Sequence, residues 1–227
     1  MNGAVLAGLM SLATVWYVPG WKRCGDPDGA AMAHAVATFP DATVEYCDWD
    51  GNRGWKKSFA NADSFAVDLA GKIEAMPEEE RASLVLVGHS MGGRIVVRTM
   101  ALLADRGVYI QQGIVMAAAI PRDDPDVAKF AQAGLSRSIS LCNPDDTVLK
   151  RFYTLSKDGW REGALGAEGT ATTVENLVEY EVPQTITRDV SIDETWAKVQ
   201  WFKDVANHYA PFYLGFLRTL MTEGQEP

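Results

Sequence analysis

Short apolar, β-branched runs alternate along this chain with longer stretches in which apolar residues recur every three or four positions. The first pattern is typical of buried strands, and the second is typical of amphipathic helices. The pattern predicts strands at residues 14–18, 43–47, 84–87, 113–119, 139–142 and 174–182. It predicts helices at residues 29–39, 62–76, 91–106, 127–133, 196–205 and 209–222, and a loop at residues 158–172. Because strands and helices alternate, we expect an α/β fold of βαβ units, with a parallel sheet between two layers of helices.

The run Gly88-His89-Ser90-Met91-Gly92 connects a predicted strand to a predicted helix. A G-x-S-x-G sequence on a strand-to-helix turn is the arrangement of a nucleophile elbow. In such a turn Gly88 and Gly92 leave space where a Cβ would clash, and Ser90 takes a strained backbone conformation. The strain presents the Ser90 hydroxyl at the N-terminus of the following helix. The alternative is a tight turn that contains a serine with no chemical role.

A serine hydroxyl is a poor nucleophile at neutral pH and needs a general base, usually a histidine held by a carboxylate. The chain has three histidines. His34 falls within a predicted helix well before Ser90, and we expect His89 to point to the opposite side of the elbow. His208 lies on a turn before the last predicted helix, and we predict that it is the base. The alternative for His208 is a surface position at a helix N-terminus.

The acid that orients the histidine should follow the carboxyl end of a later strand, where parallel sheets collect their functional groups. The run at residues 140–149 fits, because a strand leads there into an Asn-Pro turn and two aspartates, Asp145 and Asp146. Only one of the two can orient the histidine, and the other would be an ordinary turn residue. Asp123 and Asp124, after the preceding strand, are weaker substitutes.

With G-H-S-M-G-G after one strand, N-P-D-D-T-V-L after a later one and a single histidine downstream, the chain resembles the α/β-hydrolase superfamily. The resemblance covers residues 13–220. The order of nucleophile, acid and histidine in that family matches Ser90, Asp146 and His208. The family's acid precedes a short x-Val-aliphatic run, and this register favours Asp146 over Asp145.

The resemblance also implies an oxyanion hole made by two backbone amides, those of Met91 and Trp21. Met91 follows the nucleophile, and Trp21 lies in the loop after the first strand. Pro19 stands in this loop where many relatives have histidine, but a backbone N–H of Trp21 would serve equally. Two preorganised donors of this kind lower the activation barrier of the reaction by several kcal/mol.

The family usually has a pair of strands ahead of the one that ends at Val18, and we expect them to be missing here. The expected architecture is therefore a trimmed α/β-hydrolase fold, three-layered, with a mostly parallel sheet of about six strands. We expect one domain over residues 1–227. Residues 1–12 would form a leader or capping segment, and residues 156–195 would form a cap or insertion over the site.

The composition narrows the classes of partner. A net charge of −9 and an isoelectric point near 4.8 argue against nucleic acid and anionic membranes, which both attract basic patches. The three cysteines leave at least one unpaired and form no C-x-x-C, which suits the reducing cytoplasm and indicates no zinc site. No run is long enough to span a membrane. We expect no cofactor and no metal.

These features predict a serine hydrolase that cleaves a carboxylic ester or thioester of a small molecule through an acyl-enzyme. An acyltransferase or a lipase would share the same three residues. A non-catalytic interaction protein with this fold is the alternative from a different functional class.

Overall fold

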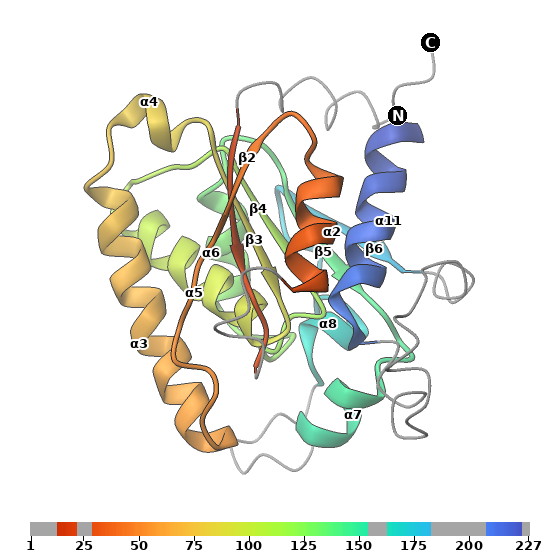
Figure 1. The fold of residues 1–227 in the computed structure, drawn as a ribbon. Helices are drawn as coiled ribbons and strands as arrows, with labels where there is room; N and C mark the ends of the chain where they lie inside the picture. The colour runs from red at the N-terminus through yellow and green to blue at the C-terminus, as the bar shows by residue number, and fades with distance from the viewer. Residues whose placement is uncertain (1–12, 22–28, 154–162, 183–207, 224–227) are drawn as a thin grey trace.

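Six parallel strands form one sheet at the centre of the computed structural model, which describes residues 13–21, 29–153, 163–182 and 208–223 (Figure 1). The strands follow the order β2-β1-β3-β4-β5-β6 across the sheet, and each neighbouring pair is parallel. Their bounds are β1 Thr14–Val18, β2 Thr43–Tyr46, β3 Leu84–His89, β4 Gln112–Met116, β5 Ser138–Cys142 and β6 Leu177–Glu181. The predicted parallel sheet of about six strands is confirmed.

Helices cover both faces of this sheet (Figure 1). Helix α5 contacts α3 and α6 on one face, and α2 contacts α11 on the other. The three-layer α/β/α architecture expected from the alternating elements is therefore confirmed. The helices are α2 Ala30–Thr38, α3 Trp55–Glu74, α4 Glu78–Arg81, α5 Met91–Asp105, α6 Asp126–Gln132, α7 Thr147–Tyr153, α8 Leu165–Glu168 and α11 Ala210–Glu223.

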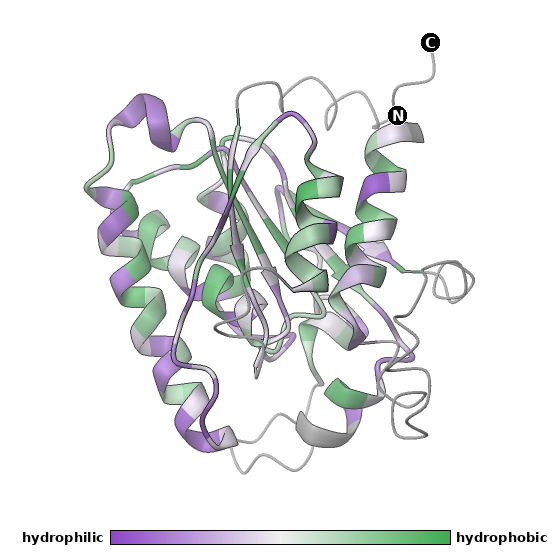
Figure 2. Ribbon diagram, viewed as in Figure 1, coloured by the Kyte–Doolittle hydropathy of each residue, from purple (hydrophilic) through white to green (hydrophobic). Residues whose placement is uncertain are grey.

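The central strand β3 shows why its sequence is continuously apolar. Val85 and Val87 belong to the hydrophobic core on the side of α2 and α11, whereas Leu84 and Leu86 belong to the core on the side of α3 and α5. All six residues of β3 are buried. A strand covered by helices on both faces cannot alternate between apolar and polar residues. In Figure 2 the central strands are accordingly mostly green, and the exposed helix α4 is purple.

Some element boundaries differ from the predicted ones. Helix α3 begins at Trp55 rather than at residue 62. Residues 55–61 are only partly buried, so the apolar spacing that predicts a helix is weak there. Strand β4 ends at Met116 rather than at residue 119, since Ala117 has a φ of 47° and leaves the extended conformation. Strand β6 is shorter than the predicted strand.

Three short helices lie where the sequence pattern predicts none, and one of them is α7, which follows β5. Helix α4 is a single turn of charged residues, and α8 lies in the Gly- and Ala-rich stretch that we expected to be a loop. The small residues let α8 pack closely: a Cβ on Gly166 would lie 2.1 Å from the carbonyl carbon of Ala117. Three predicted segments lie wholly or partly outside the described residues: the leader at 1–12, the helix at 196–205, and residues 156–162 and 183–195 of the cap.

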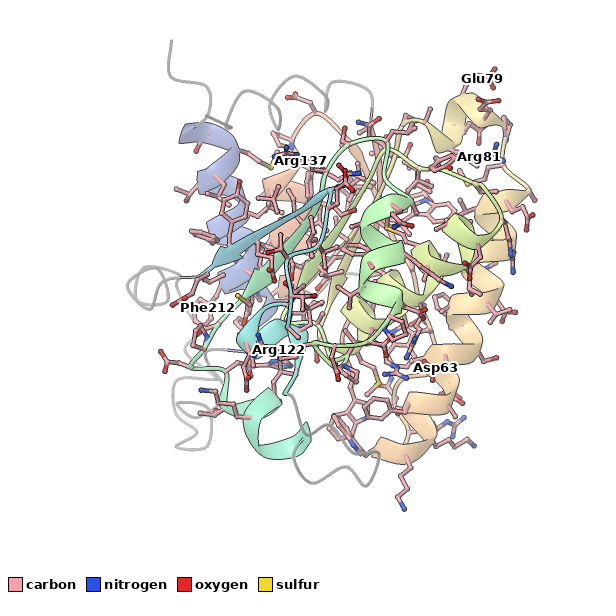
Figure 3. All side chains as sticks on the ribbon, turned by 180° about the vertical axis from the view of Figure 1, so that it is seen from behind. Asp63, Glu79, Arg81, Arg122, Arg137 and Phe212 are labelled. Carbon is pink, nitrogen blue, oxygen red and sulfur yellow. The ribbon has the colours of Figure 1, made fainter. Side chains whose placement is uncertain are left out.

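Ion pairs connect the helices on one side of the sheet. Asp63 of α3, labelled in Figure 3, accepts from Arg94 of α5 with an Nε–Oδ1 distance of 2.8 Å. Arg98 of α5 pairs with Asp124, at 2.7 Å, and with Asp126 at the start of α6. None of the helices in the described ranges is both long enough and apolar enough to cross a membrane.

Helix α5 begins in direct contact with the ends of β1 and β3. A Cβ on Gly92 would lie 2.1 Å from the carbonyl oxygen of Val18 and 2.7 Å from that of Pro19. A Cβ on Gly88 would lie 2.4 Å from the carbonyl oxygen of Gly92. These distances are far below a normal carbon–oxygen contact, so only glycine fits at both positions.

We predict that Gly92→Ala lowers the free energy of unfolding by about 3 kcal/mol, because backbone atoms of β1 must move to admit the new methyl group. Gly71→Ala is the matched control, since Gly71 lies within α3 and its Cβ would meet no atom within 4 Å. This control should gain up to about 1 kcal/mol, because alanine favours the helix. Urea denaturation measures both, and equal effects of the two substitutions would contradict the close contact.

Candidate active site

Ser90 lies at the turn between β3 and α5, with φ of 56° and ψ of −117°. This left-handed conformation is unfavourable for a residue with a Cβ, and it costs about 1–3 kcal/mol. Backbone hydrogen bonds to β4 and to the loop after it hold this conformation in place. The Ser90 N–H donates to the carbonyl of Met116 at 2.9 Å, and the Ala119 N–H donates to the carbonyl of Ser90 at 2.9 Å. The strained elbow expected from the glycine spacing is thus present in the structure.

His208 lies just before α11, and its ring bridges two residues from distant parts of the chain. Its Nε2 lies 2.8 Å from Ser90 Oγ, and its Nδ1 lies 2.6 Å from Asp146 Oδ2. A carboxylate only accepts hydrogen bonds, so Nδ1 carries the proton in this pair. In the neutral ring Nε2 is then free to accept the hydroxyl proton of Ser90. This is the arrangement that a serine needs in order to become a nucleophile.

Asp146 is fully buried at the start of α7, and the fold holds both of its oxygens. Oδ1 accepts the backbone N–H of Leu149 at 2.9 Å, which is the bond that an N-cap residue makes to the third residue of its helix. Oδ2 faces His208. The neighbouring Asp145 is exposed, and its N–H donates to the side chain of Asn143 at 2.9 Å. The structure therefore brings Asp146, and not Asp145, to His208.

The substitute acids and the remaining histidine occupy other places. Asp123 is exposed, and Asp124 forms the ion pair with Arg98 described above. His34 lies in α2, where partial burial and then the nearby charge of Arg218 lower its pKa.

The loop after β1 lies against Ser90. A Cβ on Gly20 would be 3.1 Å from Ser90 Cβ, so this loop passes directly beside the serine. The buried indole of Trp49 donates from Nε1 to the carbonyl of Pro19 at 2.9 Å, and the indole of Trp21 donates to the carbonyl of Arg53 at 3.0 Å. Two tryptophans thus attach the loop to the segment between β2 and α3.

One of the two residues expected to form the oxyanion hole adjoins the serine in the chain, and the other belongs to the loop after β1. Met91 follows Ser90 as the first residue of α5 and is fully buried. Trp21 comes from the loop that passes beside Ser90, and its ring contacts the ring of Trp55 edge-on, with centroids 5.1 Å apart. Trp55 in turn contacts Phe59 edge-on at 4.9 Å.

The expected orientation of His89 is wrong. Its Nε2 lies 2.8 Å from the carbonyl oxygen of His208, and the two rings have centroids 5.0 Å apart. Neighbouring side chains point to opposite sides only while the strand continues, and at Ser90 the backbone turns out of the extended conformation. His89 therefore lies on the same side as the candidate base.

Tyr213 is a second contact that the sequence pattern did not reveal. Its place in an apolar helical stripe indicates a core residue, and it is indeed fully buried. Its hydroxyl also donates to Asp146 Oδ2 over 3.4 Å. Burial, followed by the charge of Asp146, raises the pKa of Tyr213 well above its usual value, so the hydroxyl keeps its proton and stays a donor. A stripe of aromatic residues gives no signal for such a contact.

The cysteines offer no competing nucleophile among the described residues. Burial raises the pKa of Cys47 to about 12 and that of Cys142 to about 11, so both remain thiols at neutral pH. Cys24 lies outside the described residues. No group of three or more His, Cys, Asp or Glu side chains within the described ranges is arranged to hold a metal ion.

One known protein family matches part of this chain. Residues 41–121 match a family model described as lecithin:cholesterol acyltransferase, and this stretch contains Ser90 but neither Asp146 nor His208. No curated protein sequence matches the chain.

Several solved structures are similar to the chain at low identity. An acetylxylan esterase is 12% identical, with 93% of this chain and 97% of that chain covered and a TM-score of 0.45. An esterase from Pyrobaculum calidifontis is 11% identical, with coverage of 92% and 76% and a TM-score of 0.44. YbtT, a type II thioesterase of the yersiniabactin pathway, is 16% identical, with coverage of 77% and 86% and a TM-score of 0.42.

The hydrogen bond between Trp49 and Pro19 leads to a stability prediction. Trp49→Phe removes the indole N–H and leaves the Pro19 carbonyl without this partner in a buried place. Trp16→Phe is the matched control, because the buried Nε1 of Trp16 has no hydrogen-bond partner among the described residues. Both substitutions remove the same atoms, so we expect Trp49→Phe to destabilise the protein by about 1–3 kcal/mol more than the control does. Guanidinium denaturation measures the difference, and a difference near zero would contradict the bond.

Proposed function

We propose that this chain, which has the α/β-hydrolase fold, is a serine hydrolase that cleaves a carboxylic ester or thioester through an acyl-enzyme. The observation that carries the proposal is the continuous contact from Asp146 through His208 to Ser90, at 2.6 and 2.8 Å. This contact ends on a serine in the strained turn of a nucleophile elbow. The three groups come from three distant segments of the chain, and together they form the series that activates a serine hydroxyl.

In the proposed mechanism Ser90 Oγ attacks the carbonyl carbon of the substrate while His208 Nε2 takes the hydroxyl proton. Asp146 stabilises the resulting imidazolium and keeps the proton on Nδ1. When the tetrahedral intermediate collapses, His208 returns the proton to the leaving alcohol or thiol, and the acyl group stays on Ser90. His208 then deprotonates a water molecule, which attacks the acyl-enzyme. As the Oγ–acyl bond breaks and the acid leaves, His208 returns this proton to Ser90 Oγ.

We also propose that the backbone N–H groups of Met91 and Trp21 bind the oxyanion. Met91 begins α5, where the helix dipole and the first N–H groups favour negative charge. The position of Gly20 against Ser90, and the anchoring of Pro19 by Trp49, support a role for the Trp21 loop. Donors held in advance in this way need no rearrangement during the reaction.

An acyltransferase is the second candidate, because the matching family model carries that name. It would form the same acyl-enzyme and transfer the acyl group to an alcohol instead of water. Product analysis with and without added alcohols separates the two reactions. A non-catalytic protein with this fold would not be labelled by a fluorophosphonate probe, which reacts only with an activated serine.

We extend the proposal to the whole chain as one α/β-hydrolase domain that acts on small-molecule esters in the cytoplasm. The cysteines at 47 and 142 form no disulfide, which is in keeping with a reducing compartment.

We predict that Ser90→Ala lowers kcat for a nitrophenyl ester by about 10⁴ or more, because the nucleophile is lost. The circular dichroism spectrum should remain that of the wild type. Alanine keeps the Cβ that the strained turn already accommodates, so the fold loses only a hydroxyl. If the variant keeps more than about a tenth of the wild-type rate, the proposed nucleophile is wrong.

The adjacent aspartates provide a matched pair of variants. We predict that Asp146→Asn lowers kcat by about 10⁴, because an amide neither stabilises the imidazolium nor keeps the proton on Nδ1. Asp145→Asn makes the same chemical change at an exposed position and should cost less than about tenfold. Steady-state kinetics on both purified variants measures the contrast. Equal losses, or a reversed order, would show that Asp146 does not orient the base.

A further inference from the structure

We infer that His89 is a positioning residue that holds the backbone of the proposed base, His208. The inference rests on the proposed function, in which His208 must stay in reach of Ser90. His89 Nε2 lies 2.8 Å from the carbonyl oxygen of His208, and His89 is buried. Both ring nitrogens of His208 are already engaged, by Asp146 and Ser90. The contact from His89 therefore fixes the backbone of His208, whereas the other two fix its ring.

The position of His89 in the chain makes this contact effective. His89 is the last residue of β3, and Ser90 follows it directly. His208 is 119 residues away from His89 in the sequence. A hydrogen bond from the nucleophile's immediate neighbour to the backbone of the base couples the two positions through a single peptide unit. A displacement of about 1 Å between reacting groups can lower a rate by about 100-fold, so such coupling has catalytic consequences.

The acceptor in this contact shows which ring nitrogen of His89 carries a proton. A backbone carbonyl only accepts, so His89 Nε2 must carry hydrogen and donate it. This Nε2–H is therefore committed to the His208 carbonyl, and His89 is not an alternative general base for Ser90 through this nitrogen.

Packing on two further sides keeps the ring of His89 in this orientation. A Cβ on Gly20 would lie 3.0 Å from His89 Nδ1, so the loop after β1 closes one side. The ring of Tyr213 lies on another side, with centroids 6.0 Å apart. His89 thus stands between the loop proposed to bind the oxyanion and the proposed base, and it contacts both.

Two amide substitutions separate the roles of the ring nitrogens. Glutamine reaches as far as Nε2 and can donate to the His208 carbonyl, whereas asparagine reaches only as far as Nδ1. We expect His89→Gln to keep kcat within about threefold and His89→Asn to lower it by about 10- to 100-fold, with KM changed less than about twofold in both. A residue that only filled space would not distinguish the amides in this way. His34→Asn, in α2, is the bystander control and should leave kcat unchanged.

Several results would overturn the inference. Equal rates for His89→Gln and His89→Asn, whether both normal or both reduced, would show that the Nε2 contact does not position the base. A loss confined to KM would place His89 in substrate binding instead.

A measurement on the unaltered protein tests the contact without any assay of activity. The chain has only three histidines, so nitrogen NMR of ¹⁵N-histidine-labelled protein resolves each ring. His89→Gln assigns the His89 signals by their loss. We expect a protonated Nε2 on His89 at neutral pH, and an unprotonated Nε2 would overturn the inference even if His89→Asn does not fold. If this signal is present but the wild type hydrolyses no ester, the proposed function fails while the contact stands.

Discussion

The close approach of the first turn of α5 to the ends of β1 and β3 is the constraint on which the candidate site depends. It is possible only because Gly88 and Gly92 have no Cβ. The same approach forces the residue between them, Ser90, into a left-handed conformation that the backbone of β4 and its following loop then holds. Hydrogen bonds between Ser90 and the backbone of Met116 and Ala119 offset this strain. The Ser90 hydroxyl is therefore fixed in place before any substrate arrives.

The topology of the sheet explains why the other groups meet there. In a parallel sheet all strands end at the same edge, so the segments after β1, β3 and β5 converge. Those segments contain Trp21, Ser90 and Asp146. His208 arrives from outside the sheet, just before α11, and three contacts hold it: Asp146 and Ser90 at its ring, and His89 at its carbonyl. Of the residues in the candidate site, His208 therefore depends most on contacts with other side chains to keep its position.

Much of this arrangement could be predicted from the sequence, since hydrophobic periodicity and glycine spacing are local signals. The order of strands and helices and the elbow at Ser90 follow from them, and the burial of Asp146 agrees with the aliphatic residues after it. The start of α3 at Trp55 was missed, because residues 55–61 are only partly buried and their hydrophobic pattern is weak. The orientation of His89 and the hydroxyl contact of Tyr213 were missed for a different reason. Both depend on how distant segments meet at a turn, and strand or helix periodicity does not extend through a turn.

The central claim is that Ser90 becomes covalently acylated during turnover. Acid quenching of the wild-type protein within milliseconds of mixing with a nitrophenyl ester, followed by intact-mass spectrometry and peptide mapping, tests it most directly. The account predicts a mass increase equal to one acyl group, located on Ser90, that forms before steady state and disappears as substrate is exhausted. An acyl group on any other residue, or hydrolysis with no acylated protein at any time, would contradict it.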